Sequence, residues 1–254
     1  MNIVVLLKQT FDTEERIVIK DGKIAEDGVE FIVNPYDEYA VEEAVKLRDE
    51  HGGEVTVITV GPERAENALR TALAMGADKA VLVNSEDVEL DEYSVGKILA
   101  SVMEDREYDI ILCGNVAVDN GSGQIGPRLA EELNIAQVTS ITNLEVNNGK
   151  VNIGRDVEGD VEIIEVSLPV LVSAQQGLNE PRYPSLPGIM KAKKKPLERI
   201  ELDDLNMDDD LLQRTVVTET FLPSKKEAGY ILNGKIEEQV KEVVNLLNNK
   251  EKVI

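Results

Sequence analysis

Short apolar runs alternate with segments of helical spacing through the first half of the chain, and this alternation constrains the fold more than any other feature. Apolar runs typical of buried strands cover residues 2–8, 54–61, 79–83 and 109–114. Segments with apolar residues at helical spacing follow them, beginning near Pro35, Ala65, Tyr93 and Gln124. Strands that alternate with helices are typical of parallel pairing. We therefore expect an α/β fold with a largely parallel sheet flanked by helices.

Turn and cap residues mark the limits of several elements. Asn34 is a good N-cap and Pro35 is favoured at the first helical position, so a helix is expected to begin there. The pair Gly52-Gly53 then ends this helix. Between two short apolar runs, Asp21-Gly22 predicts a tight hairpin.

The pattern changes after residue 136. The strand-like runs at 138–146, 150–157, 161–166 and 169–174 are separated by turn residues such as Asn147-Asn148-Gly149 and Glu158-Gly159-Asp160. They predict a meander that extends or flanks the sheet.

The C-terminal part of the chain predicts an arm that ends in a helix. Residues 198–210 hold seven acids and one arginine, which is typical of a solvated linker. Near the C-terminus, one helix face is apolar, through Ile236, Val240, Val243, Val244 and Leu247. We therefore expect a domain over residues 1–197 and an arm over residues 198–254.

Charge and composition exclude several classes of function. The 254 residues carry a net charge of −22, which argues against nucleic acid and anionic membranes as principal partners. No apolar run reaches the roughly 18 residues of a membrane span, so the chain is not expected to insert into a membrane. The only cysteine is Cys113 and the only histidine is His51, so a metal site built from cysteine or histidine and a Ser-His-Asp triad are not expected. A reducing cytoplasm is the expected location.

One segment, residues 174–196, is basic within this acidic chain. It holds five basic residues and one acid, Glu180, which works against solubility unless an acidic partner docks there. Pro181, Pro184 and Pro187 stiffen it. Leu186 and Met190 fit neither helical nor strand spacing. Leu186 is the candidate apolar contact with a partner, and Lys191, Lys193, Lys194 and Lys195 would steer the encounter. The alternative is that Leu186 packs on its own domain and the lysines only solvate a loop.

A glycine-rich segment, Gly121-Ser122-Gly123-Gln124-Ile125-Gly126, matches the dinucleotide pattern G-x-G-x-x-G. It begins seven residues beyond the preceding strand and does not lie on the first strand–helix turn, so the match to an NAD site is incomplete. The turn does lead into a helix N-terminus near Gln124, where free N–H groups and the helix dipole favour a phosphate. Two alternatives to a phosphate site remain open. The segment could be a tight loop with Ser122 as N-cap and no ligand, or it could bind NAD in an NAD-linked dehydrogenase.

Several long segments together resemble one known family. They are NPYDEYAVEEAVKLRDE, RTALAMGADKAVLV, VAVDNGSGQIGPRLAEEL and LNEPRYPSLPGIMKAKKKPL, the last preceded by LPVLVSAQQG. In this order they resemble the β subunit of electron transfer flavoprotein over essentially the full length. The resemblance implies an adenine nucleotide α-hydrolase-like, nucleotide-binding fold over residues 1–197, with residues 174–196 as a recognition loop.

The resemblance also implies a function. The chain would form a heterodimer with an α subunit that holds most of the FAD. The FAD would accept electrons from acyl-CoA and related flavin dehydrogenases, as in fatty acid β-oxidation, and pass them towards a membrane quinone reductase. The chain would be an electron carrier without catalytic residues of its own, because the cofactor carries the redox chemistry.

Site residues follow from the same resemblance. An AMP site is implied at Leu6, Asn34, Pro35, Tyr36, Asp37, Val60, Asp119, Asn120, Gly121, Ser122, Gly123, Gln124, Ile125, Gly126, Pro127, Arg128, Leu129 and Ala130. For Leu6 and Val60, core packing is the simpler expectation, and for Tyr36, surface packing is an alternative. Partner recognition is implied for Arg182, Tyr183, Leu186, Met190, Lys191, Lys193, Lys194 and Lys195, with Asn179 and Arg182 holding the base of the loop.

A bifurcating branch of the family binds a second FAD where other members bind AMP. Its loop resembles D-G-D-T-A-Q-V-G, whereas residues 119–126 here agree with it only at the two ends. AMP is therefore the expected ligand, and a second FAD is the alternative.

Overall fold

The computed structural model describes residues 1–86, 88–147, 149–205, 207, 213–226, 228–229 and 231–253. The chain divides into two compact units. Unit 1 comprises Met1–Val18 and Ile24–Thr218, and unit 2 comprises Ile19–Lys23 and Glu219–Ile254. The two units are described separately.

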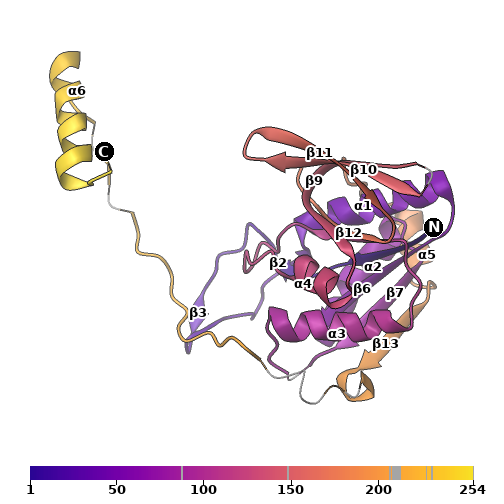
Figure 1. The fold of residues 1–254 in the computed structure, drawn as a ribbon. Helices are drawn as coiled ribbons and strands as arrows, with labels where there is room; N and C mark the ends of the chain where they lie inside the picture. Colours follow the sequence, from indigo (N-terminus) through magenta and orange to yellow (C-terminus); the bar gives the residue numbers. More distant parts are fainter. Residues whose placement is uncertain are drawn as a thin grey trace. The chain divides into compact units, whose positions relative to one another are not determined.

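Nine strands in the described part of unit 1 form one sheet, in the order β11-β10-β9-β12-β8-β1-β6-β7-β13 (Figure 1). They are β1 (Asn2–Leu6), β6 (Glu54–Gly61), β7 (Lys79–Asn84), β8 (Ile110–Gly114), β9 (Ala136–Asn147), β10 (Lys150–Val157), β11 (Asp160–Ser167), β12 (Val170–Ala174) and β13 (Leu197–Glu201). From β9 to β13 in this spatial order, the strands run parallel to one another, whereas β10 pairs antiparallel with both β9 and β11. The predicted α/β fold is confirmed.

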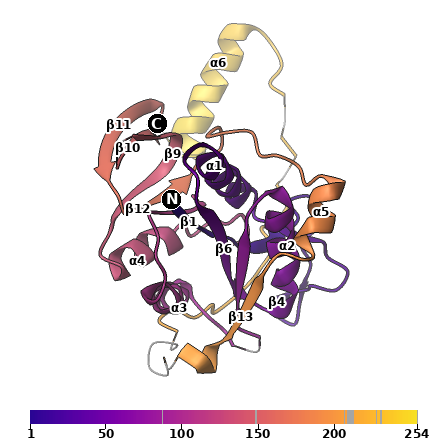
Figure 2. The ribbon, with the colours of Figure 1, turned by 90° about the vertical axis from the view of Figure 1, so that its right-hand side faces the viewer.

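Helices cover both faces of the sheet (Figure 2). Helices α1 (Pro35–His51) and α2 (Glu66–Met75) share a buried cluster with Ile3 and Val5 of β1. Helices α3 (Glu92–Glu104) and α4 (Ile125–Glu132) share a second cluster with Val4 and Leu6. Successive side chains of a strand point to opposite faces, so the unbroken apolar run of β1 supplies both clusters.

The strand order reverses next to β1. The chain places β6 and then β7 on one side of β1, and afterwards returns to place β8 on the other side. Open α/β sheets bind ligands at such a switch point, outside the carboxyl ends of the strands. Here those ends are Leu6 of β1 and Gly114 of β8.

The predicted meander is confirmed for β9, β10 and β11 but is wrong for β12. Strand β12 lies between β8 and β9 and is parallel to both. All five of its residues are buried, which is typical of a parallel strand covered on both faces. The long strand β9 first pairs with β12 and then with β10, and Asn148 of the predicted turn lies outside the described residues.

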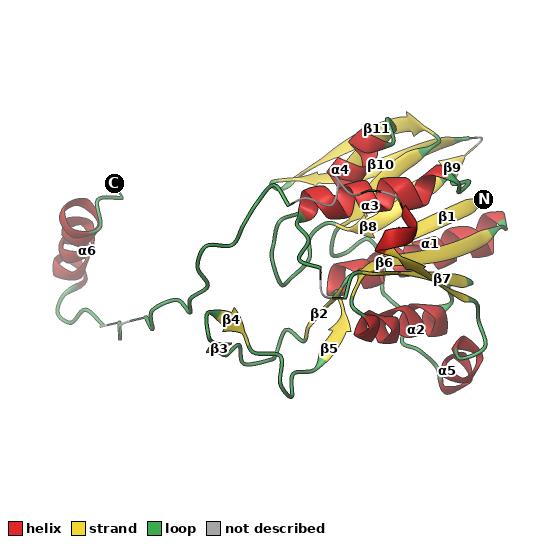
Figure 3. Ribbon diagram, turned by 90° about the horizontal axis from the view of Figure 1, so that it is seen from below, coloured by secondary structure: helices red, strands yellow, loops and turns green. Residues whose placement is uncertain are grey.

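Four short strands, labelled β2 to β5 in Figure 3, form two further sheets of two strands each. Strands β2 (Gln9–Phe11) and β5 (Phe31–Val33) pair antiparallel. Strands β3 (Ile19–Lys20) and β4 (Lys23–Ile24) are joined by Asp21 and Gly22, both with positive φ, 53° and 76°. Two positive φ angles are the requirement of a type I′ turn, so the predicted hairpin is confirmed.

The acidic segment after residue 197 begins as a strand instead of a linker. Edge strand β13 pairs with β7, and a 3₁₀ turn, Leu202–Leu205, follows it. Leu202 is buried, Ile200 packs on the second cluster, and the charged residues of β13 face solvent. The prediction of a solvated linker considered only the acidic residues and overlooked the alternation of apolar and charged residues in this strand. Asn206 and Asp208–Asp210 lie outside the described residues, and the domain boundary at residue 198 stays a prediction.

In unit 2, the predicted C-terminal helix is present as α6 (Ile236–Asn245), which continues as a π-helical turn, Leu246–Lys250. None of the residues of α6 is buried. Its apolar residues Ile236, Val240, Val243 and Val244 are all exposed.

Candidate functional site

Asp37, in the first turn of α1, joins the two strand ends at the switch point. Its carboxylate accepts the backbone N–H of Lys8, just beyond β1, at 2.6 Å, and that of Gly114, the last residue of β8, at 2.9 Å. The side chain is buried. Burial raises the pKa of Asp37 to about 7, although these N–H donors and the charge of Lys8 favour the ionised form. A Cβ atom on Gly114 would lie 2.3 Å from Oδ1 of Asp37, so the contact requires glycine there.

Asn34 holds the loop that follows β8. Its Nδ2 donates to the carbonyl of Val116 at 3.0 Å, and its Oδ1 accepts the N–H of Val118 at 3.1 Å. Helix α1 begins after Asn34 as predicted, but the side chain does not cap the helix. The amide instead forms hydrogen bonds with two backbone groups of a loop that is far away in the sequence. Preferences for N-cap residues consider only neighbours in the sequence, so they could not predict this partner.

The loop from Asn115 to Gln124 is compact. The N–H of Gly121 donates to the carbonyl of Ala117 at 2.8 Å, and the Lys8 ammonium pairs with Asp119 at 2.7 Å. Gly121 and Gly123 have φ angles of 66° and 60°, which glycine adopts without strain. A Cβ atom on Gly123 would also lie 3.3 Å from the Asn115 carbonyl.

Helix α4 begins where this loop ends. The N-cap position falls on Gln124 and not on Ser122, so the Ser122 cap of the alternative without a ligand is not formed. The Gln124 side chain does not cap the helix either, because its Oε1 accepts from the guanidinium of Arg128 at 2.8 Å. The first N–H groups of α4 therefore keep their capacity to bind an anion.

Asn115, directly after β8, connects this strand to β9 and β12. Its Oδ1 accepts from the hydroxyls of Ser140 and Ser173, each at 3.1 Å. Asn115 follows β8, Ser140 lies in β9 and Ser173 in β12. Sequence analysis missed Asn115, Ser140, Ser173 and Lys8. Asn115 was detectable as a polar residue directly after a predicted strand, and Lys8 as the polar last residue of one, whereas nothing local marks Ser140 or Ser173.

The structure brings most of the residues implied for the nucleotide site to one edge of the sheet. Leu6 and Val60 lie at the carboxyl ends of β1 and β6, and both pack on the α3–α4 side. Half-buried Tyr36 lies against Gly114. In α4, by contrast, the Leu129 and Ala130 side chains are buried in the core, so they face away from the loop. Their assignment to the site stays a prediction, as do the others.

The basic segment contains a short helix, α5 (Leu186–Ala192). The prediction that Leu186 and Met190 lie in neither a helix nor a strand is therefore wrong. Ser185 caps this helix by accepting the N–H of Gly188 at 3.1 Å. The sequence does contain helix-start signals, Ser185 as N-cap and Pro187 in the first turn. They were not interpreted as a helix because the surrounding segment is rich in proline. A Cβ atom on Gly188 would lie 2.6 Å from the carbonyl of Ala74, so glycine lets α5 approach α2 closely.

Two side chains hold the base of this segment on α1. Asn179 donates to the Tyr39 carbonyl at 3.0 Å and to Glu43 at 2.9 Å. Arg182 binds Glu42 through two nitrogens of its guanidinium, at 2.7 and 3.0 Å. This geometry is the one expected for the loop base, and a contact of Arg182 with a partner stays a prediction.

Three large side chains of the segment point into solvent. Tyr183 is 95% exposed, Leu186 is 73% exposed and Met190 is 66% exposed. Leu186 therefore does not pack on its own domain, which excludes the simpler alternative for this residue.

The four lysines differ in their surroundings. Lys191, Lys193 and Lys194 are exposed, whereas the Lys195 ammonium donates to the carbonyls of Leu73, at 3.0 Å, and Ala77. Burial lowers the pKa of Lys195. Lys195 thus binds the C-terminal end of α2, and its part in steering a partner stays a prediction.

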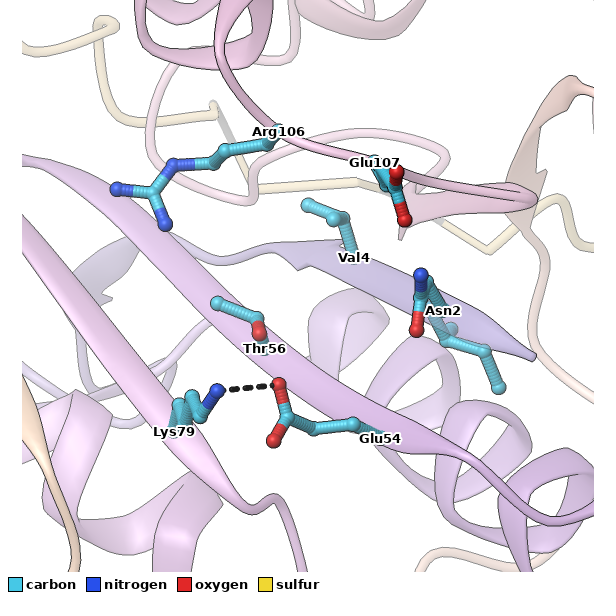
Figure 4. A pocket seen from close by; sticks show the side chains of 8 residues that line it. Asn2, Val4, Glu54, Thr56, Lys79, Arg106 and Glu107 are labelled. Atoms are coloured by element: carbon cyan, nitrogen blue, oxygen red, sulfur yellow. Dashed lines mark ion pairs between the residues drawn. The ribbon is translucent and has the colours of Figure 1, made fainter.

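A cavity of about 300 Å³ lies at the opposite edge of the sheet (Figure 4). It is lined by Asn2, Ile3, Val4, Glu54, Thr56, Lys79, Arg106 and Glu107, at the amino ends of β1, β6 and β7. Its cations are paired, Lys79 with Glu54 at 2.7 Å and Arg106 with Glu198 at 2.8 Å. These pairs leave the charges satisfied, so the switch point remains the candidate ligand site.

Fold and site together define an open α/β domain with a candidate ligand site at its switch point and, apart from that site, a short exposed helix, α5. The described residues contain no cluster of three His, Cys, Asp or Glu side chains placed to hold a metal ion. None of the described helices is long and apolar enough to cross a membrane.

Comparison with known proteins gives the family. Residues 21–205 match the electron transfer flavoprotein domain. The chain is 61% identical to the electron transfer flavoprotein subunit beta of Bacillus subtilis (strain 168), with 100% of both chains covered. It is 43% identical to that of Thermoanaerobacterium thermosaccharolyticum, with 98% and 99% covered, and 34% identical to that of Bos taurus, with 91% and 99% covered. The chain therefore belongs to the electron transfer flavoprotein family, as a β subunit. Membership makes it part of a flavoprotein of electron transport, and a β subunit implies an α-subunit partner.

Proposed function

We propose that this chain is an electron-carrier subunit that binds AMP at the switch point and assembles with an α subunit holding most of one FAD. The observation that carries the AMP site is the glycine-rich loop at the end of β8. Asn34 and Asp37 hold its base, and it leads into the uncapped N-terminus of α4. A phosphate at that N-terminus would accept from backbone N–H groups, which Gly121 and Gly123 leave accessible. AMP is then a structural ligand, because a ligand that binds only the folded state stabilises it.

A second FAD at the same place is the second candidate. The loop agrees at both ends with that of bifurcating members but differs at Asn120 to Gly123, which favours AMP. An NAD-linked dehydrogenase is disfavoured, because β8 ends at Gly114 and the glycine pattern begins only at Gly121.

Electron exchange in this proposal needs no catalytic acid, base or nucleophile from the chain. The flavin supplies the redox chemistry when bound. The chain contributes the docking surface on α5, where Leu186 contacts acyl-CoA and related flavin dehydrogenases and exposed lysines steer the encounter. Electrons then leave for a quinone reductase in the membrane, and the cytoplasm is the proposed location.

The C-terminal arm belongs to assembly in this proposal. Helix α6 exposes an apolar face formed by Ile236, Val240, Val243 and Val244. An amphipathic helix without a buried residue gains stability by covering such a face. We propose that the α subunit covers it.

The decisive experiment identifies the bound molecules. The heterodimer is purified and denatured, and the released nucleotides are separated and quantified. One FAD and one AMP per heterodimer support the proposal. Two FAD without AMP support a bifurcating protein, whereas tight NAD(H) binding without flavin contradicts the electron-carrier role.

A further inference from the structure

Asp91, at the start of α3, binds a segment more than 120 residues away in the sequence. Its Oδ1 accepts the N–H of Ser94 at 3.0 Å and so caps α3. Its Oδ2 accepts the N–H groups of Arg214 and Thr215, at 2.7 and 2.8 Å, and the Thr215 hydroxyl, at 3.0 Å. One carboxylate thus caps a helix with one oxygen and holds residues 214 and 215 with the other.

A second contact supports the same attachment. The guanidinium carbon of Arg214 lies 5.0 Å from the centroid of the Tyr93 ring, within the range of a cation–π interaction. Tyr93 is in the first turn of α3, so both contacts hold the segment to one helix end. The donors to Asp91 hold its pKa below its ordinary range, so the carboxylate is charged at neutral pH.

The attached residues occupy a special position in the chain. Unit 1 ends at Thr218, three residues beyond Thr215, and the part of the C-terminal arm that belongs to unit 2 and carries α6 begins at Glu219. Arg214 and Thr215 are therefore held to the start of α3 just before this part of the arm begins. A chain fixed at its start samples a smaller volume than one fixed farther back, which raises the effective concentration of its distal end.

We propose that Asp91 is a positioning residue for assembly: it fixes the start of the C-terminal arm and thereby promotes docking of α6 on the α subunit. The inference rests on the proposed docking of α6. Loss of the attachment lengthens the free arm and removes three charge-assisted hydrogen bonds. We expect the dissociation constant of the heterodimer to rise about two- to threefold, mainly through faster dissociation of the arm.

The test uses Asp91→Ser. Serine is a good N-cap, so α3 keeps its cap, but its single short hydroxyl cannot also reach residues 214 and 215. Asp105→Ser, at an exposed position at the other end of α3, is the matched control for loss of one charge from the same helix. Thr215→Val is a milder second variant that removes only the hydroxyl bond. Each full-length chain is titrated with purified α subunit, and hydrogen exchange of the Arg214 and Thr215 amides is measured in the free chain.

The expected result has two parts. Asp91→Ser speeds exchange of the two amides and weakens the heterodimer about two- to threefold, Thr215→Val has a smaller effect in the same direction, and Asp105→Ser has no effect. In a background of Val240→Asp, which spoils the apolar face of α6, Asp91→Ser no longer changes the affinity, because the tether acts through the arm. Equal affinity of Asp91→Ser and wild type, or a loss of affinity that persists undiminished in the Val240→Asp background, overturns the inference. Failure of the wild-type chain to bind the α subunit at all contradicts the proposed function instead.

Discussion

The carboxylate of Asp37 accepts the backbone N–H of Gly114 at 2.9 Å, so a residue of α1 holds the last residue of β8. The same carboxylate accepts the N–H of Lys8 beyond β1. Neither contact uses a side-chain donor, which makes the arrangement independent of side-chain rotamers on the two strands. The two strands that flank the switch point are thus joined by one buried acid.

Asp37 predicts a pH-dependent stability. Its folded-state pKa, about 7, lies above its ordinary value of 3.8, so folding favours the protonated form. The stability that this group contributes is fully present below the unfolded-state pKa and is lost as the pH rises through about 7. Asp37→Asn removes this titration. Between pH 4.5 and 8, we expect the free energy of unfolding of wild type to fall relative to Asp37→Asn, by up to roughly 3 kcal/mol.

Chemical denaturation of both proteins across this pH range measures the difference. The charge of Lys8, which favours ionised Asp37, is present in both proteins. Parallel curves of stability against pH for the two proteins would contradict the raised pKa.

Gly123→Val tests the nucleotide loop. Valine at a φ of 60° is strained, and its Cβ would crowd the Asn115 carbonyl, so we expect loss of bound AMP and a stability lower by about 1–3 kcal/mol. Gly159→Val is the matched control, because Gly159 also has a positive φ, 100°, but lies in the β10–β11 turn with no neighbour within 4 Å of an added Cβ. Nucleotide released on denaturation is quantified for both. Undiminished AMP in Gly123→Val argues against a ligand at this loop.

Leu186→Ala tests the docking helix. Because Leu186 is 73% exposed, the substitution is expected to change stability by less than about 0.5 kcal/mol and to leave the FAD content intact. Loss of an apolar contact at the centre of a docking surface is expected to slow flavin reduction by an acyl-CoA dehydrogenase about tenfold at limiting concentration. Val161→Ala, an exposed apolar residue of β11, serves as control. Unchanged transfer kinetics in Leu186→Ala would rule out the docking role.

The lysines of the basic segment are expected to act in two different ways. Replacing Lys191, Lys193 and Lys194 together by glutamine removes exposed charge, so association with the dehydrogenase slows and its dependence on salt flattens. Lys195→Gln instead removes donors from the carbonyls at the end of α2, so it lowers the melting temperature by a few degrees. Stopped-flow kinetics at several salt concentrations and thermal unfolding separate the two effects. The same salt dependence in the triple variant and in wild type contradicts steering.

Local pattern was sufficient for most of the fold and only part of the site. The alternation of apolar runs and helices predicts the parallel sheet because both strand faces are buried, and Asp21-Gly22 predicts its hairpin through backbone preference alone. The insertion of β12 between β8 and β9 depends on pairing between distant segments, so it was missed. For the same reason Asn34 was expected to cap α1, whereas its amide binds Val116 and Val118.

The close approach of Gly188 to Ala74 has a kinetic consequence. Helix α5 is formed and seated on α2 before any partner arrives, with Arg70 donating to the carbonyl of Ala192 at its far end, at 2.9 Å. A partner therefore does not have to fold this segment on contact, and little chain entropy is lost. The rate of a productive encounter is then governed by diffusion and orientation instead of by a conformational step.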